Sequence, residues 1–135
     1  MSEKTLTFEV VTPVRKVLSK EITSLIVPAI EGYLGVLPNH APLICGLEPG
    51  VVKYKEGNEY KKLAISGGFL EVSHNKATII ANAAELPEDI DVARAKAAKE
   101  RAEKRLKQRT PDIDLARAKA ALKRAMARLK VANDS

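Results

Sequence analysis

Hydrophobic and polar residues follow one pattern up to about residue 83 and a different one beyond residue 87. In the first stretch, short apolar segments rich in Val, Ile and Leu are interrupted every several residues by Gly, Pro or Asn. Such punctuation is typical of antiparallel β structure. It predicts nine strands, at residues 5–12, 14–22, 24–29, 32–37, 42–47, 50–54, 58–66, 68–72 and 77–81. We therefore expect a sandwich or barrel with mostly local strand pairing, including hairpin turns at residues 56–58 and 73–75.

Beyond Glu88 the apolar residues recur in steps of three and four, which indicates helices. The first helix is expected over residues 91–107, with either Asp89 or Asp91 as its cap. The seam of the first helix consists of Ala95, Ala98, Ala102 and Leu106. The seam of the second consists of Leu115, Ala118, Leu122, Ala125 and Leu129.

The break between the two helices is expected at residues 109–111. Thr110 is the expected N-cap of the second helix and Pro111 its first helical residue, with Asp112 and Asp114 in the first turn. Because the connection is short, the helices are expected to fold back as an antiparallel hairpin. Alanine seams bury little area, so this hairpin is expected to be weakly packed and able to open.

Composition divides the chain at the same point. All seven glycines and six of the seven prolines lie at or before Pro87. Basic and acidic residues balance at nine each before Glu88, whereas 14 basic residues face 8 acidic ones from there on, so the tail carries the whole net charge of +6. We expect two parts, a β-sandwich at residues 1–86 and a basic helical hairpin at residues 87–135.

Signals of catalysis are missing from the sequence. No Gly-x-x-x-x-Gly-Lys-Ser/Thr motif occurs, and a lone Cys45 offers no zinc spacing. His40 and His74 fall in predicted loops and are expected to be ordinary surface residues, so we do not expect an enzyme. The longest apolar runs span only a few residues, from which we expect a cytoplasmic protein that neither crosses a membrane nor is secreted.

Four arginines of the tail fall at neighbouring levels of the expected hairpin. With the turn near residue 111, Arg94 lies level with Arg128, and Arg101 lies about level with Arg124. Guanidinium groups gathered in this way match phosphate oxygens, so a polyphosphate would favour the closed hairpin. The alternative is that the arginines form two solvated helix faces, and the helical wheel favours it because Arg124 and Arg128 point away from the leucine seam.

A basic helical pair also suits nucleic acid, and a nucleic-acid-binding module is the alternative function. The tail has no aromatic residue to stack on bases, which counts against that alternative. A membrane-surface helix is disfavoured because the tail has Leu and Ala without Phe or Trp.

Three segments resemble one known family. They read GYLGVLPNHAPL at residues 32–43, SGGFLEV at residues 66–72 and IDVARA at residues 90–95. In this order and spacing the chain resembles the bacterial F-type ATP synthase epsilon subunits over essentially its full length. The resemblance implies an N-terminal antiparallel β-sandwich of about ten strands followed by a C-terminal two-helix domain.

The same resemblance implies a function. Members of this family are non-catalytic rotor subunits of the central stalk, peripheral at the cytoplasmic face of the plasma membrane. Their sandwich binds the gamma subunit and the c-subunit ring and helps couple proton flow to ATP synthesis. Their tail can lie folded or extend along gamma toward the alpha and beta subunits, where it blocks ATP hydrolysis. A neutral sandwich with a basic tail suits that division of roles.

The resemblance also implies a regulatory ligand. The family's nucleotide motif, Ile/Leu-Asp-x-x-Arg-Ala, is matched by Ile90, Asp91, Arg94 and Ala95. In relatives that bind ATP, further contacts come from positions that match Arg101, Arg124, Arg128 and the sandwich carboxylate Glu85. We therefore expect ATP, with or without Mg²⁺, to lock the hairpin closed.

Overall fold

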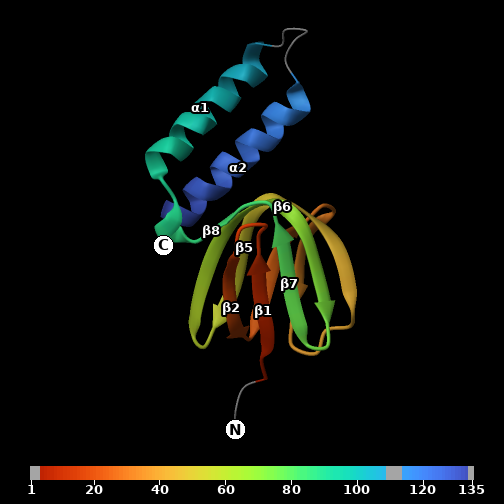
Figure 1. Ribbon diagram of the computed structural model, residues 1–135. Coiled ribbons are helices and arrows are strands. Elements are labelled where there is room, and N and C mark those ends of the chain that lie inside the picture. Colours follow the sequence, from red (N-terminus) through yellow and green to blue (C-terminus); the bar gives the residue numbers. More distant parts are fainter. Residues whose placement is uncertain (1–3, 109–113, 134–135) are drawn as a thin grey trace.

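Burial alternates along residues 6–11 and 76–81, as expected for strands with one face on a core. In the computed structural model, which describes residues 4–108 and 114–133, the described chain forms one eight-stranded sheet. The strands are β1 (Leu6–Val11), β2 (Lys16–Ile22), β3 (Ser24–Ala29), β4 (Gly32–Val36), β5 (Leu43–Glu56), β6 (Glu59–Ser73), β7 (Lys76–Ala81) and β8 (Ala84–Glu85). Their order is β2-β1-β7-β6-β5-β3-β4, and β8 pairs with β6. Figure 1 shows the sheet curling around on itself to enclose a core. The predicted sandwich followed by two helices is confirmed.

Two long strands replace four predicted ones. The segments expected at 42–47 and 50–54 are continuous in β5, and those at 58–66 and 68–72 are continuous in β6. The two strands pair antiparallel along their length, from Leu43 opposite Val72 to Glu56 opposite Glu59. Pro49, Gly67 and Gly68 suggested strand ends from the sequence, but the pairing of β5 with β6 continues past them in one register, and both glycines adopt positive φ. The prediction of two separate strands in each of these segments was therefore wrong.

In the described part of the chain, all strand pairs are antiparallel except one, and four of the seven pairs join strands that follow each other in the sequence. The first strand, β1, pairs antiparallel with β2 but parallel with β7, with Phe8 opposite Ala77. The predicted hairpins are confirmed: Gly57 and Asn58 join β5 to β6, and His74 and Asn75 join β6 to β7. Both His74 and Asn75 have positive φ, at 52° and 56°, which is the geometry of a tight hairpin turn.

The core lies between the two curled halves of the sheet. Phe8 and Tyr54 pack against each other in it, with ring centroids 5.3 Å apart and ring planes tilted by 51°, and burial raises the pKa of the Tyr54 phenol. On the outer face, Glu9 lies between Lys76 and Lys16, at 2.9 and 3.1 Å. Hydrogen bonds from these two ammonium groups lower the pKa of Glu9 to about 2. Charge thus links β1, β2 and β7 at Glu9 on the outer face, and apolar side chains pack on the inner face.

Two antiparallel helices follow the sandwich, α1 (Val92–Gln108) and α2 (Leu115–Asn133), as Figure 1 shows. Asp91 caps α1, since its Oδ1 accepts a hydrogen bond from the backbone N–H of Arg94 at 3.1 Å. Asp114 caps α2 in the same way, with Arg117 N–H at 3.0 Å. The expectation that Asp114 belongs to the first turn was therefore wrong, and the expected roles of Thr110, Pro111 and Asp112 lie outside the described residues.

The hairpin docks on the sandwich chiefly through α2, which packs against β5 and β6. A small apolar cluster joins them, formed by Val51, Ala64, Ala127 and Val131 with Ile90 packed against it. We call this the docking cluster. The docking cluster is separate from the main core, so the tail is attached to the sandwich through a small apolar contact of its own. No helix among the described residues is long and apolar enough to span a membrane.

Candidate anion-binding site

A cavity of about 250 Å³ lies where the sandwich, the start of α1 and the end of α2 meet. Its walls carry two guanidinium groups and three carboxylates. The lining residues are Glu85, Asp89, Asp91, Arg94, Ala95, Ala98 and Arg128. The volume is below the roughly 300–1,000 Å³ of usual small-molecule pockets, so a nucleotide would leave part of itself outside the cavity.

Folding brings five of the eight predicted site residues together in this cavity, namely Glu85, Asp91, Arg94, Ala95 and Arg128. A sixth, Arg124, joins Glu85 and Arg128 in an adjoining crevice that Ser66 and Ala83 also line. Glu85 and Arg128 line both spaces, so Arg124 lies next to the cavity.

The remaining two predicted residues lie elsewhere. Arg101 is exposed on α1 and lines neither space. Ile90 packs its side chain into the docking cluster, one residue before the cap of α1. Its contribution to the site is therefore to hold the start of α1 against the sandwich.

Each carboxylate of the cavity already has a partner. Glu85 accepts a hydrogen bond from Arg128 Nε at 2.5 Å, and both side chains are only about 30% exposed (28% and 31%). Asp91 caps α1 through the Arg94 N–H, and Asp89 pairs with Arg15 of the β1–β2 connection at 3.7 Å. Arg128 is therefore held against the sandwich. The alternative prediction, in which it lies on a solvated helix face, does not hold for this residue.

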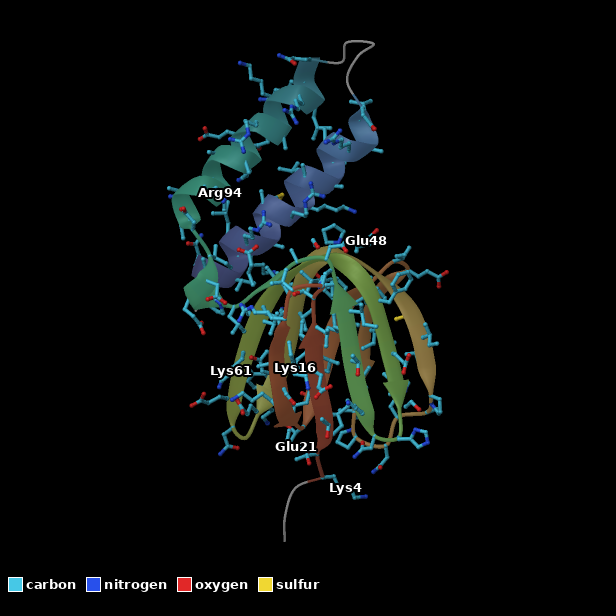
Figure 2. The ribbon with its side chains drawn as sticks, in the orientation of Figure 1. Lys4, Lys16, Glu21, Glu48, Lys61 and Arg94 are labelled. Carbon is cyan, nitrogen blue, oxygen red and sulfur yellow. The ribbon has the colours of Figure 1, made fainter. Side chains whose placement is uncertain are left out.

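Two guanidinium groups remain available to a ligand. Within the described residues, the side chains of Arg94 and Arg124 make no ion pair or hydrogen bond with another part of the chain. Arg94 lies in the first turn of α1 (Figure 2), next to the amide groups that carry the positive end of the helix dipole. A bound anion would therefore meet free positive charge from both helices.

Some residues of the junction escaped the sequence reasoning. The sequence did single out Asp89, as a candidate cap beside the motif at residues 90–95. Its place in the cavity, however, depends on the turn at Pro87–Asp89. No feature of the sequence pointed to Lys123 and Glu48, which form an ion pair at 3.4 Å. They lie 75 residues apart, on elements whose docking the sequence did not specify. Figure 2 shows Glu48 at the end of the sandwich that faces α2.

A second candidate surface is an apolar row across the outer face of the sheet. Phe69 lies beside Ile80 on the neighbouring strand, and the exposed fractions of these side chains are 61% and 51%. Ile80 lies beside Val11 in turn, and Ile44 is exposed nearby on β5. Large exposed apolar side chains that are contiguous mark interaction sites. We call this surface the apolar row.

Metal ligands are not gathered at either surface. Among residues 4–108 and 114–133, no group of three or more His, Cys, Asp or Glu side chains is arranged to hold a metal ion. The carboxylates of the cavity are oriented toward arginines and backbone amides instead.

Comparison with known proteins gives a consistent result. Residues 5–87 match the model of the ATP synthase delta/epsilon chain β-sandwich domain, and residues 88–133 match that of the long α-helix domain of the same chain. The ATP synthase epsilon chain of Pelotomaculum thermopropionicum is 55% identical over 110 residues, covering 82% of each chain. That of Carboxydothermus hydrogenoformans is 50% identical over 111 residues, again covering 82% of each.

Solved structures support the fold. A chain from the Euglena gracilis mitochondrial ATP synthase, in an OSCP/F1/c-ring structure, has a TM-score of 0.81 at 21% identity, covering 98% of this chain and 84% of that one. A chain from the central stalk and c-ring of the Tetrahymena thermophila mitochondrial ATP synthase has a TM-score of 0.57 at 16% identity, covering 99% and 98%.

The fold and the two matched domains define a sandwich-and-helix subunit of a larger assembly. The chain belongs to the ATP synthase delta/epsilon chain family, and as an epsilon chain it is a central-stalk subunit of ATP synthase.

Proposed function

We propose that this chain is a non-catalytic rotor subunit that couples rotation to ATP synthesis and inhibits ATP hydrolysis through its helical tail. The observation that carries the proposal is the small docking cluster, which attaches a tail of net charge +6 to a neutral sandwich. A strongly basic element that is held by a small apolar cluster and two ion pairs can leave its docked position and bind acidic surfaces. The proposed location is the cytoplasmic face of the plasma membrane, peripheral within the complex.

The apolar row is the surface that we propose for the gamma subunit. Its exposed side chains and its β-sheet backing give a rigid, apolar contact of the kind found in stable protein interfaces. For the c-subunit ring we propose the turn between β3 and β4 with the start of β4, where Ile30 and Tyr33 are 63% and 68% exposed. When released, the tail would extend along gamma toward the alpha and beta subunits.

Removal of the tail tests the inhibitory role. A chain that ends at residue 87 retains the main core, the apolar row and the β3–β4 turn. We therefore expect it to assemble normally and to raise ATP hydrolysis by the reconstituted complex severalfold. Loss of assembly, with inhibition unchanged in the complexes that do form, would contradict the proposed division of roles.

ATP is the regulatory ligand that we propose for the cavity. Arg94, Arg124 and Arg128 would hold the phosphates, with Arg101 contributing from farther along α1, and the helix amides at Asp91 to Ala95 would add to the positive field. Because these groups come from both helices and from the sandwich edge, ATP would favour the docked hairpin. A Mg²⁺ ion could accompany the triphosphate, held by phosphate oxygens and water.

Arginine variants test the ATP site. We expect Arg94→Ala and Arg124→Ala each to weaken ATP binding by about tenfold or more, since each removes a charge-assisted contact. Isothermal titration of the isolated protein measures this. Arg117→Ala is the matched control, because Arg117 is exposed on α2 and lies outside both linings. Equal affinity for all three variants and the wild type would remove the assignment.

No observation favours the nucleic-acid-binding alternative. The guanidinium groups nearest the cavity face a confined space rather than an open groove that could follow a strand.

A further inference from the structure

The path of paired strands ends at β2 and at β4, and only β2 is protected against pairing with another chain. Among the described residues each of these strands pairs on one side only, β2 with β1 and β4 with β3. An edge strand presents unpaired backbone N–H and C=O groups, to which an extended segment can add. The β2 edge carries exposed charges at Lys16, Lys20 and Glu21, and its pairing with β1 shifts register between Val10 and Val11. Charges and irregularities of this kind keep an edge from pairing further.

The β4 edge has none of these protective features. Its five residues read GYLGV, with no charged residue and no proline. They pair with β3 in one unbroken register, from Gly32 opposite Ala29 to Val36 opposite Leu25. A regular, uncharged edge is open to the addition of another strand.

Gly35 of β4 lacks the usual reasons for a glycine inside a strand. Its φ is not positive, unlike that of Gly32, and a Cβ built on it would meet no atom within 4 Å. Glycine weakens a strand, because it has more backbone freedom to lose and no side chain to pack. Neither backbone geometry nor packing within the chain requires Gly35, and the remaining use of a strand glycine is to let another backbone approach closely.

A cavity of about 570 Å³ borders β4 and offers a place for one side chain of a partner. Apolar side chains of the β3–β4 turn, β4 and β5 line it, among them Ile30, Leu34 and Leu43. Its volume falls within the roughly 300–1,000 Å³ of usual binding pockets. Glu31 is the charged residue of the lining, and among the described residues its carboxylate makes no ion pair or hydrogen bond. A basic residue of the partner would complement it.

We propose that β4 is a site of strand addition. An extended segment of the subunit bound at the β3–β4 turn pairs with β4 through its main chain, places an apolar side chain in the cavity and sets a lysine or arginine against Glu31. Main-chain hydrogen bonds supply affinity in this mode of recognition, and the side-chain pocket supplies specificity. This inference rests on the contact proposed for the β3–β4 turn, since Ile30 and Tyr33 belong to both surfaces.

The test compares Gly35→Lys with Asn58→Lys in the full chain. Each variant is titrated into an ATP synthase complex from which this chain has been removed. We expect Gly35→Lys to weaken binding by about tenfold or more, because a lysine on the edge obstructs main-chain pairing. The open space around Gly35 lets the variant fold, which thermal unfolding of the free chain checks. Asn58→Lys adds the same charge at an exposed residue of the β5–β6 turn and should bind like the wild type.

Hydrogen exchange of the wild-type chain, free and in the complex, reports the main-chain pairing itself. Backbone amides of residues 32–36 that point away from β3 should exchange fast in the free chain and at least about tenfold more slowly in the complex. A loss of affinity in Gly35→Lys without this protection would mean that the lysine blocks only a side-chain contact, and would overturn strand addition.

Ile30→Ser separates this inference from the contact proposed for the turn, since it removes an exposed apolar side chain and leaves the β4 backbone unchanged. If Ile30→Ser weakens binding while Gly35→Lys does not, and residues 32–36 gain no protection, the turn is a contact without strand addition. If Gly35→Lys weakens binding and residues 32–36 become protected while Ile30→Ser binds normally, strand addition is supported and the turn contact is refuted. If neither variant loses affinity and no protection appears, both proposals fall.

Discussion

Replacement of Gly68 by alanine is expected to destabilise the sandwich by about 3 kcal/mol or more. Gly68 lies inside β6 with φ at +141°, a conformation that residues with a side chain rarely adopt. A Cβ there would overlap the backbone oxygen of Ile80 and would stand 2.9 Å from the Cα of Ala81. Both atoms belong to the neighbouring strand, so relief of the clash requires the β6–β7 ladder to separate.

Urea unfolding followed by circular dichroism measures this effect, and Gly35→Ala is the matched control. Gly35 lies on β4, and a Cβ added to it would meet no atom within 4 Å. The control is expected to change the free energy of unfolding by about 0.5 kcal/mol or less. A Gly68→Ala protein as stable as the control would mean that β6 and β7 do not approach each other as described.

The SGGF segment illustrates how much the sequence could reveal about the fold. The sequence predicts a strand break at Gly67, between strands at 58–66 and 68–72, whereas β6 runs through both glycines, which adopt positive φ. A glycine pair between two apolar runs fits a turn and a continuous strand equally well, and only pairing with β5 and β7 selects the continuous strand. Non-local pairing also decides the parallel contact between β1 and β7, which no local pattern encodes.

The candidate site was predictable where it depends on helix geometry. Arg94 and Arg128 were placed at one level of the hairpin by their spacing alone, and both line the cavity. The same reasoning placed Arg101 level with Arg124, but Arg101 is exposed and lines neither space, because spacing fixes height along a helix and not the direction of docking. The two ion pairs to Glu48 and Glu85 depend on how α2 lies on the sandwich, so they required the structure.

Val131→Asp is expected to release the tail from the sandwich. Val131 is fully buried in the docking cluster, where it packs with the apolar side chains of Val51, Ala64 and Ala127. Loss of the apolar contact and burial of a charge together should cost the docked state about 3 kcal/mol or more. A change of that size lowers the ratio of docked to undocked tail by about a hundredfold. Faster hydrogen exchange over residues 123–131 would report the release.

Met126→Asp is the control, because it introduces the same charge on the same helix at a side chain that is 50% exposed. It should leave exchange close to that of the wild type. If the undocked tail is the inhibitory form, the Val131→Asp chain should suppress ATP hydrolysis by the reconstituted complex more strongly than the wild type, and saturating ATP should relieve less of that inhibition. A variant with a released tail and unchanged hydrolysis would show that docking does not control inhibition. A variant whose exchange matches that of Met126→Asp would show that the docking cluster does not hold the tail.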